Sequence, residues 1–290
     1  MKIGLSTKID QYKQLTKFKV DLIVALTAVF GYVIGSHGHI NWWTLTSIFA
    51  GGFLVTATAH IINQLIERRY DRQMRRTANR PLVTGQISRL EAITALLIMS
   101  FTGLSLLYFW VHPLAAFISF VSLIMYAFVY TPMKQLHRLS IWIGAIPGAL
   151  PILIGYVGAV GHIDLLAILL FTFQVFWQLP HFWSIAWFWH DEYTKAGYDL
   201  LPLKGGTNDV NALWTALSIL PLFPLIYLFY HFGYISFSLL FILLFLSFLF
   251  ALAAYKFYQN TNNKTAKQMT LASIIYLPIV QLILMFHFIN

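Results

Sequence analysis

Residues 63–85 read NQLIERRYDRQMRRTANRPLVTG and form the most highly charged segment of a chain that is otherwise almost entirely apolar. Within this segment Asn63, Glu67 and Asp71 recur at intervals of four residues. On an α-helix each such interval turns about 40° around the axis and rises about 6 Å, so the three oxygen-bearing side chains share one face. Pro81 is expected to end this helix, because proline lacks an N–H and disfavours helical geometry in the residue before it.

The same segment is rich in arginine, with Arg68, Arg69, Arg72, Arg75, Arg76 and Arg80. Hard oxygen ligands suit Mg²⁺, which usually binds one or two carboxylates together with substrate phosphates. Arginine side chains bind phosphate oxygens through their planar fork of N–H groups. The alternative is an ordinary basic loop in which the acidic residues only pair with the arginines. The repeat on one helical face favours a site for a metal-bound diphosphate.

The composition indicates a membrane protein that crosses the bilayer several times. Of the 290 residues 59% are hydrophobic and 10% are charged, and the mean hydropathy is +0.70. Soluble domains carry about 25% charged residues. The chain has no cysteine, which excludes disulfides and thiolate chemistry. The first twenty residues are basic and polar, and no cleavage site of small residues follows the first apolar run, so no removed signal peptide is expected.

Nine segments are long and apolar enough to cross a bilayer, which takes about 20 residues. They are residues 20–36, 43–65, 90–111, 114–131, 140–160, 164–188, 212–231, 235–254 and 269–288. Pro180 lies within the sixth segment and predicts a kink there or a helical extension beyond the bilayer. Since every connecting loop is short, we expect an all-α bundle of nine transmembrane helices and a single domain over residues 1–290.

All 19 lysines and arginines lie in the N-terminal arm or in alternate loops. They are Lys2, Lys8, Lys13, Lys17 and Lys19; Arg68, Arg69, Arg72, Arg75, Arg76, Arg80 and Arg89; Lys134 and Arg138; Lys195 and Lys204; and Lys256, Lys264 and Lys267. Basic loops mark the cytoplasmic side. We therefore expect a cell-membrane protein whose N-terminus is cytoplasmic and whose C-terminus is outside. The net charge of +9 reflects this topology and attraction to membrane lipid, and nucleic-acid binding is not expected.

A second group of polar residues lies at the inner end of the sixth segment, which continues as WQLPHFWSIAWFWHDEYTK. Asp191 and Glu192 are predicted to lie on the same side of the membrane as the first acidic cluster, where two such clusters can hold Mg²⁺ around a diphosphate. Lys134, in the loop between the clusters, is a candidate for binding the anion. His181 lies deeper in the span, where an ionisable side chain is a functional candidate. A histidine bonded to a free backbone carbonyl explains that position equally well.

These motifs resemble those of the UbiA-type intramembrane prenyltransferases. Asn63, Glu67 and Asp71, followed by MRRTANRPL at residues 74–82, are similar to the first family signature. WQLPHF at residues 177–182 is similar to the second signature, in the version found in the protohaem IX farnesyltransferase subfamily. The nine-span topology agrees with the superfamily, and the resemblance covers most of the chain.

The resemblance implies an Mg²⁺-dependent transfer of a farnesyl group from farnesyl diphosphate to a vinyl group of haem B, with water addition giving haem O. It assigns the metal to Asn63, Glu67 and Asp71, a second metal to Asp191 or Glu192, the diphosphate to Arg76, Arg80 and Lys134, and a catalytic position near the haem to His181. Contact with haem A synthase or with the assembly of a terminal oxidase is a further expectation. The chain departs from the superfamily in having Glu67 where many members have aspartate. It also has adjacent Asp191 and Glu192 in place of two aspartates four residues apart.

Two other functions remain open. One is a related prenyltransferase that acts on another aromatic acceptor or on a porphyrin carboxylate. The other is a membrane transporter, although transporters usually place charged residues near the middle of the bilayer. Here the acidic residues gather at the ends of the second and sixth segments, which favours a reaction site at the membrane interface.

Overall fold

The computed structural model describes residues 5–289. In the order of the chain the elements are α1 (Leu5–Thr16), α2 (Phe18–Ser36), α3 (Trp42–Asp71), α4 (Pro81–Thr84), α5 (Arg89–Trp110), α6 (Pro113–Ile124), the π-helical segment η1 (Met125–Tyr130), α7 (Thr131–Leu136), α8 (Ser140–Val160), α9 (Leu165–Phe188), α10 (His190–Lys195), α11 (Asp209–Leu217), α12 (Leu222–His231), α13 (Phe237–Gln259) and α14 (Asn263–Ile289). The predicted all-α class is confirmed within residues 5–289. Lys2 lies outside the described residues.

Nine helical stretches within the described part of the chain are long and apolar enough to cross a membrane. Seven of them are single helices, namely α2, α3, α5, α8, α9, α13 and α14. The other two are composite, since α6, η1 and α7 run on as one span and α11 and α12 share another. The nine predicted segments are thus confirmed in number and order, and the protein is a multi-pass membrane protein.

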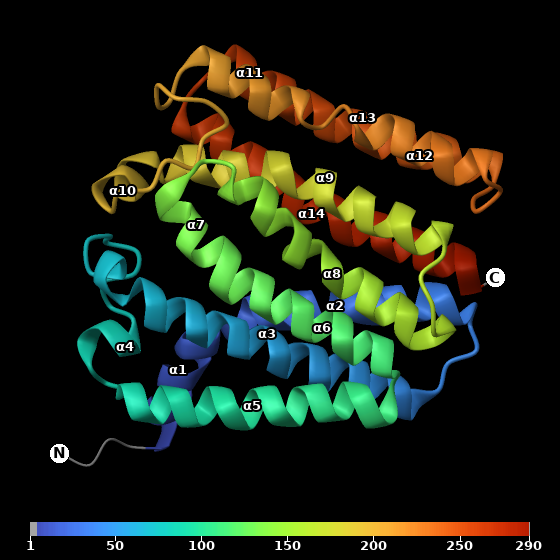
Figure 1. The fold of residues 1–290 in the computed structure, drawn as a ribbon. Helices are drawn as coiled ribbons and strands as arrows, with labels where there is room; N and C mark the ends of the chain where they lie inside the picture. The colour runs from blue at the N-terminus through green and yellow to red at the C-terminus, as the bar shows by residue number, and fades with distance from the viewer. Residues whose placement is uncertain (1–4, 290) are drawn as a thin grey trace.

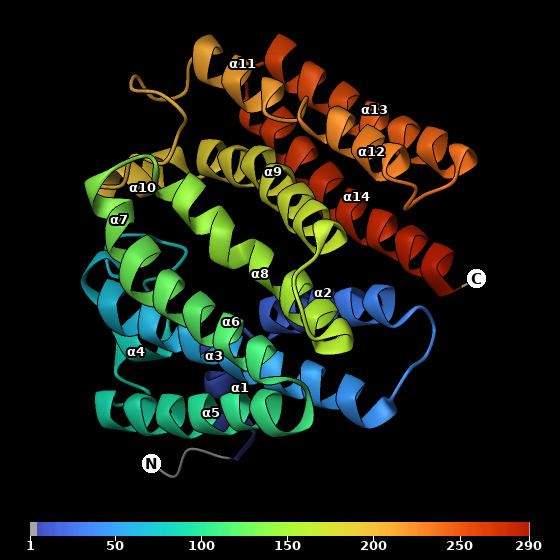
Figure 2. The same cartoon turned by 45° about the vertical axis from the view of Figure 1, so that its right-hand side comes forward.

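The helices form two groups that meet along α2 and α8. Figures 1 and 2 show α3, α5 and α6 on one side of this pair and α9 with α11 to α14 on the other. The backbones of α2 and α8 approach very closely at Gly31 and Gly155, where a methyl group would overlap the carbonyl oxygens of Ile152 and Ala28. Small residues allow such close approach in membranes, where the backbone packing itself holds helices together.

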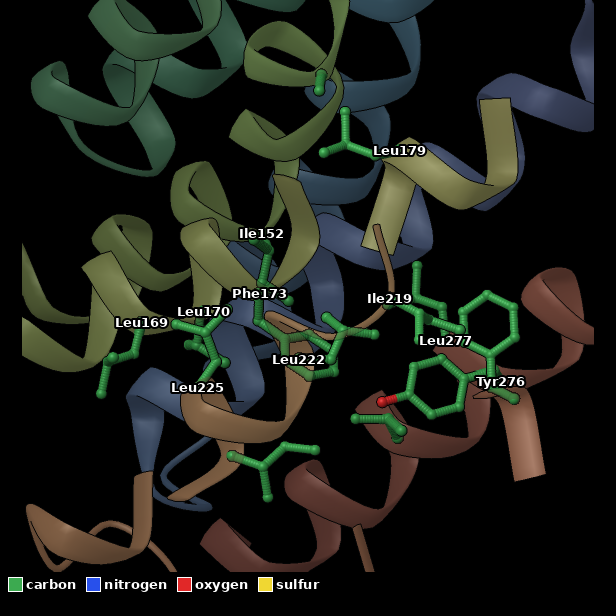
Figure 3. Close-up of a cluster of buried hydrophobic side chains, with 14 of the residues drawn as sticks. Ile152, Leu169, Leu170, Phe173, Leu179, Ile219, Leu222, Leu225, Tyr276 and Leu277 are labelled. Atoms are coloured by element: carbon green, nitrogen blue, oxygen red, sulfur yellow. The ribbon is translucent and has the colours of Figure 1, made fainter. Parts of the chain in front are cut away.

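The second group is packed around large apolar side chains of α9, α12 and α14 (Figure 3). Phe173 stacks on Tyr276, with 6.2 Å between ring centroids and 28° between ring planes. The hydroxyl of Tyr276 is satisfied by Ser247 Oγ at 2.7 Å. A buried tyrosine needs such a partner, so this group of helices is fixed by packing and by a specific polar contact.

Two helix boundaries differ from the sequence prediction around Pro81. α3 ends at Asp71, and Pro81 begins α4. The prediction that Pro81 ends the long helix was therefore wrong. A proline is favoured at the first position of a helix, because its missing N–H would have no partner there. The chain turns back earlier because the hydroxyl of Thr77 donates to the backbone carbonyl of Asp71 at 2.9 Å.

Two spans are less regular than the hydropathy predicts. The seventh is broken at residues 218–221, because Pro221 has no N–H to continue the helical hydrogen bonds. The break turns Ile219 into the apolar core, where it is 1% exposed (Figure 3). The fourth span contains the π-helical segment Met125–Tyr130. By contrast Pro180 is accommodated inside an unbroken α9.

The loops that carry most of the charge lie together. Figure 1 shows the turn after α3, then α4, α7 and α10 at the same end of the bundle, on the left of the view. We call this the basic end. It brings the first acidic segment, the loop with Lys134 and the second acidic segment into one neighbourhood, as the loop pattern predicts.

Candidate active site at the basic end

One face of α3 carries three buried oxygen-bearing side chains. Asn63, Glu67 and Asp71 are 1%, 5% and 1% exposed. They lie on the last turns of α3, which extends past the apolar part of its span to the basic end. The prediction that a single helix presents all three is confirmed. Burial of two carboxylates in a membrane protein is costly unless they are paired, so their partners decide what this face does.

Each of the two carboxylates lies against a cationic side chain from another element. Lys134 of α7 forms an ion pair with Glu67. Arg80, in the turn before α4, donates from Nη1 to Asp71 Oδ2 at 2.7 Å. The side chains of both cations are largely buried, with 12% and 19% exposed. The sequence prediction had these residues near the acidic face, and the structure brings them into direct contact with it.

The amide of Asn63 is oriented by a hydrogen bond that it donates to Thr131, the residue that follows the π-helical segment. Asn63 Nδ2 donates to Thr131 Oγ1 at 3.2 Å, and that hydroxyl in turn donates to the Tyr126 carbonyl at 2.9 Å. Because the amide nitrogen is engaged on one side, the amide oxygen is directed to the other. π-helical segments often occur at functional sites, and here one sets the position of both Thr131 and Lys134.

Lys17 is a site residue that sequence reasoning missed. It lies between α1 and α2 and donates from Nζ to Asn63 Oδ1 at 3.4 Å. Its backbone is left-handed, with φ at 54°, a conformation that non-glycine residues adopt only where the surroundings enforce it. Burial, and then repulsion from Arg80 and Lys134, lowers the pKa of Lys17 to about 7. No local pattern distinguishes this lysine from Lys13 or Lys19.

The elbow at Lys17 is held by two polar side chains of α3. Gln64 Nε2 donates to the Leu15 carbonyl at 2.6 Å and to the Gln14 carbonyl at 3.2 Å. One turn earlier on α3, His60 Nδ1 lies 2.5 Å from Asp21 Oδ1. These contacts anchor the end of α1 and the start of α2 to the helix that carries the acidic face. They explain how the strained backbone at Lys17 is maintained.

The acidic face has the chemistry of an Mg²⁺ site. Asp71 Oδ1 is buried and has no hydrogen-bond partner among residues 5–289, and an orphaned buried carboxylate oxygen calls for a cation. Two carboxylates and one amide oxygen are ligands that Mg²⁺ accepts when phosphate oxygens complete its coordination. Residues 5–289 hold no group of three or more histidine, aspartate or glutamate side chains that could bind a metal. The two carboxylates and the amide of α3 would form part of a coordination shell, and phosphate oxygens would supply the rest.

The second acidic segment meets the first through a clasp between loops. Glu192 Oε2 accepts from the backbone N–H of Arg75 at 2.6 Å. This hydrogen bond holds the pKa of the Glu192 carboxyl below its ordinary value. Arg76 donates to the Tyr193 hydroxyl at 3.0 Å and lies 5.6 Å from the Trp189 ring centroid. The turn that follows α3 thus touches α10, which follows α9, and both acidic segments lie on the same side of the bundle, as predicted. Asp191 is exposed to solvent.

We expect the change Glu192→Ala to loosen residues 72–80. Alanine cannot accept the Arg75 amide hydrogen, so this turn keeps only the hydrogen bond from Arg76 to Tyr193 as a link to α10. Amide hydrogen exchange followed by mass spectrometry should show faster exchange in the turn, with little change in the spans. Asp191→Ala is the matched control and should leave exchange in the turn unaltered. Equal exchange in the wild type and Glu192→Ala would contradict the clasp.

His181 lies on α9 and is held against α14. Its Nδ1 lies 2.7 Å from Ser273 Oγ. The ring stacks on Trp177 at 5.1 Å with 15° between planes, and Trp177 Nε1 donates to the Ser273 carbonyl at 3.0 Å. The structure thus gives His181 polar partners on a neighbouring helix and does not bring it into contact with the acidic face of α3.

The sequence of this chain matches a known protein family and named relatives. The UbiA prenyltransferase family matches residues 24–275. A protein named protoheme IX farnesyltransferase from Cytophaga hutchinsonii is 40% identical over 202 residues, which are 70% of this chain and 71% of the relative. A protein of the same name from Flavobacterium psychrophilum is 34% identical over 284 residues, 94% of this chain and 93% of the relative.

Two solved structures have the same fold. A digeranylgeranylglyceryl phosphate synthase superposes with a TM-score of 0.79 at 21% identity, over 97% of this chain and 99% of the other. A UbiA homologue from Archaeoglobus fulgidus bound to GPP and Mg²⁺ gives a TM-score of 0.63 at 18% identity, over 96% and 99% of the two chains. Together with the sequence relatives they confirm the resemblance read from the motifs: this chain belongs to the UbiA prenyltransferase family.

Proposed function

We propose that this protein transfers the farnesyl group of farnesyl diphosphate to a vinyl group of haem B, and that water addition completes haem O. The proposal rests on one observation, the buried face of Asn63, Glu67 and Asp71, in which each side chain has one cationic partner. Two relatives, 40% identical over 70% of this chain and 34% identical over 94% of it, are named as protoheme IX farnesyltransferases. They favour it over a different aromatic acceptor and over a transporter.

In this proposal the oxygens of Asn63, Glu67 and Asp71 hold Mg²⁺, and Arg76, Arg80, Lys134 and Lys17 bind the diphosphate. The metal, when bound, supplies charge neutralisation for the leaving diphosphate. The lysines and arginines add fixed positive charge where negative charge develops, which is the interaction that accelerates ionisation of an allylic diphosphate. A UbiA homologue bound to a prenyl diphosphate and Mg²⁺ supports the pairing of metal and substrate in this family.

Aromatic side chains of the π-helical segment are suited to the allylic cation. The ring centroids of Tyr126 and Tyr130 lie 5.2 Å apart, and Lys134 Nζ lies 4.9 Å from the Tyr130 ring centroid. Aromatic faces attract cations and their bulk keeps water away from a reactive centre. We infer that the rings of Tyr126 and Tyr130 shield the allylic cation from water until it reacts with the acceptor.

The acceptor side of the site is proposed to include His181, as a haem contact or an axial ligand of its iron. Its other ring nitrogen, Nε2, is the atom that would ligate iron, because Nδ1 is held by Ser273. We expect His181→Ala to shift the absorption bands of haem bound to the purified protein. Ser273→Ala removes only the orienting partner and should give a smaller shift. Identical haem spectra for wild type and His181→Ala would rule out ligation.

The direct test of the function offers purified protein in nanodiscs farnesyl diphosphate, Mg²⁺ and haem B, and measures the product by mass spectrometry. We expect a haem that has gained one farnesyl group and one hydroxyl group, because water gives its oxygen to the former vinyl group and releases a proton as the diphosphate leaves. A parallel reaction with aromatic acids tests the alternative acceptor. Product from the acids and none from haem would overturn the choice of acceptor while leaving the diphosphate site intact.

Further assignments remain proposals. We propose that the basic end faces the cytoplasm of the cell, with the N-terminus inside and the C-terminus outside, because basic residues are retained on that side of membranes. One domain over residues 1–290, a second metal on Asp191 or Glu192, and contact with haem A synthase or a terminal oxidase assembly also stay predictions.

A further inference from the structure

Each of the three metal ligands proposed on α3 already has a cationic partner of its own. The oxygens of Asn63, Glu67 and Asp71 are contacted by Lys17, Lys134 and Arg80 respectively. The three cations come from three different elements, the α1–α2 elbow, α7 and the turn before α4. Such a one-to-one match goes beyond what charge balance requires, since Asn63 is neutral and still receives a lysine.

The same three cations are the groups that a diphosphate needs. A cation that is bonded to a protein oxygen is less available to phosphate, and an oxygen that is bonded to a lysine or arginine is less available to metal. Mg²⁺ alone would bring two positive charges to a face whose two carboxylates are already neutralised. Diphosphate alone would have to compete with Glu67 and Asp71 for Lys134 and Arg80. Each ligand on its own therefore meets an opposing interaction.

We propose that metal and diphosphate bind by an exchange of partners. Mg²⁺ takes the oxygens of Asn63, Glu67 and Asp71 as Lys17, Lys134 and Arg80 move to the phosphate oxygens. All charges are paired when both ligands are bound and also when neither is bound, but not when one ligand binds alone. The exchange rests on the proposed function of this site, and it makes the two ligands cooperative: each raises the affinity for the other by the same factor.

The exchange has a practical consequence for a lipid-embedded enzyme. With neither ligand bound the site is internally paired, so its buried charges do not destabilise the fold. A metal ion or a phosphate-containing lipid headgroup that arrives alone is disfavoured, while the metal-bound diphosphate is accepted. The selectivity comes from the resident cations and not from the shape of the site.

The test measures binding of single ligands by titration calorimetry in nanodiscs. Three titrations are compared: Mg²⁺ alone, farnesyl diphosphate alone in chelator, and Mg²⁺ in the presence of farnesyl diphosphate. We expect Mg²⁺ alone to bind wild-type protein about a hundredfold more weakly than in the third titration, within the usual range of coupling between sites. Because Mg²⁺ and diphosphate also associate in solution, the variants carry the decisive comparison.

Lys134→Met removes the resident cation of Glu67. We expect it to strengthen binding of Mg²⁺ alone about tenfold and to weaken binding of farnesyl diphosphate alone about tenfold. A lysine that only clamps phosphate would alter the second titration and leave the first unchanged. The matched control is Arg138→Met, in the turn that follows α7. It also frees a carboxylate, because Arg138 Nη2 lies 3.3 Å from Asp199 Oδ2. It should leave both titrations as in the wild type.

Lys17→Met is a second variant, which should fold even if Lys134→Met does not. Its partner Asn63 is neutral, so the substitution leaves no buried charge without a partner. It should shift both titrations in the same directions by smaller factors. Unchanged Mg²⁺ affinity in both lysine variants, or equal Mg²⁺ affinity with and without diphosphate in the wild type, would overturn the exchange. Failure of the site assignment looks different: Asp71→Asn would then leave Mg²⁺ binding in the presence of diphosphate unaltered.

Discussion

Asp71→Asn is expected to lower the rate of prenyl transfer about a thousandfold, or about 4 kcal/mol of transition-state stabilisation, while the protein stays folded. Asparagine has nearly the shape of aspartate and lacks its charge. Asp71 is 1% exposed, and one of its oxygens has no hydrogen-bond partner in the described part of the chain. A carboxylate in that position is held for a cation, so loss of its charge should weaken binding of the metal that stabilises the leaving diphosphate.

The measurement is single-turnover formation of prenylated haem, with thermal unfolding of the same samples as the check on folding. Asp199→Asn is the control. That carboxylate also pairs with an arginine, Arg138, at the basic end, but it is 48% exposed. The control should retain wild-type turnover, because a paired surface carboxylate contributes little to stability or to the site. Near-normal turnover by Asp71→Asn would remove Asp71 from the metal site.

Gly155→Ala is expected to destabilise the protein by about 3 kcal/mol, a cost typical of overpacking a close contact. The added methyl group would overlap the backbone carbonyl of Ala28, and a backbone atom cannot rotate away as a side chain can. α2 and α8 would have to separate. Since α2 begins at the elbow that holds Lys17, their separation should also weaken the contact between Lys17 and Asn63.

Gly52→Ala provides the matched comparison for this effect. A methyl group there would lie 4.0 Å from the Ala28 side chain, an ordinary contact. Because alanine favours helix over glycine by about 1 kcal/mol, this variant should unfold at the wild-type temperature or above it. The measurement is thermal unfolding of both variants in the same lipid composition. We expect Gly155→Ala to unfold at a lower temperature than Gly52→Ala. If both variants unfold together, close approach of α2 and α8 does not stabilise the fold.

Much of the architecture was predictable because the bilayer constrains local sequence. A span needs a continuous apolar run wherever it lies in the bundle, so nine segments could be counted without knowledge of their packing. The shared face of Asn63, Glu67 and Asp71 was likewise predictable, because helical periodicity is a local property. Their partners Arg80 and Lys134 followed from loops that the charge pattern places on one side.

The parts that could not be predicted depend on contacts between distant residues. α3 ends at Asp71 because Thr77 turns back onto it, and no proline or glycine marks that boundary. Lys17 is one of several lysines in a basic arm, and only the packing of the elbow against α3 selects it. The contact of Glu192 with the Arg75 backbone N–H joins residues far apart in the sequence. The side of the membrane on which Asp191 and Glu192 lie could therefore be predicted, but the partner of Glu192 could not.

The central claim is that one face of α3 holds the metal that binds the diphosphate. Its most direct test is a crystal of the protein grown with Mn²⁺ in place of Mg²⁺ and with a non-hydrolysable farnesyl diphosphate analogue, and the position of the anomalous scattering peak. We expect a peak within about 2.5 Å of the oxygens of Asn63, Glu67 or Asp71, next to phosphate density, a margin that allows for the coordination distance of such ions. A peak found only beside Asp191, or analogue bound at the opposite end of the bundle, would contradict it.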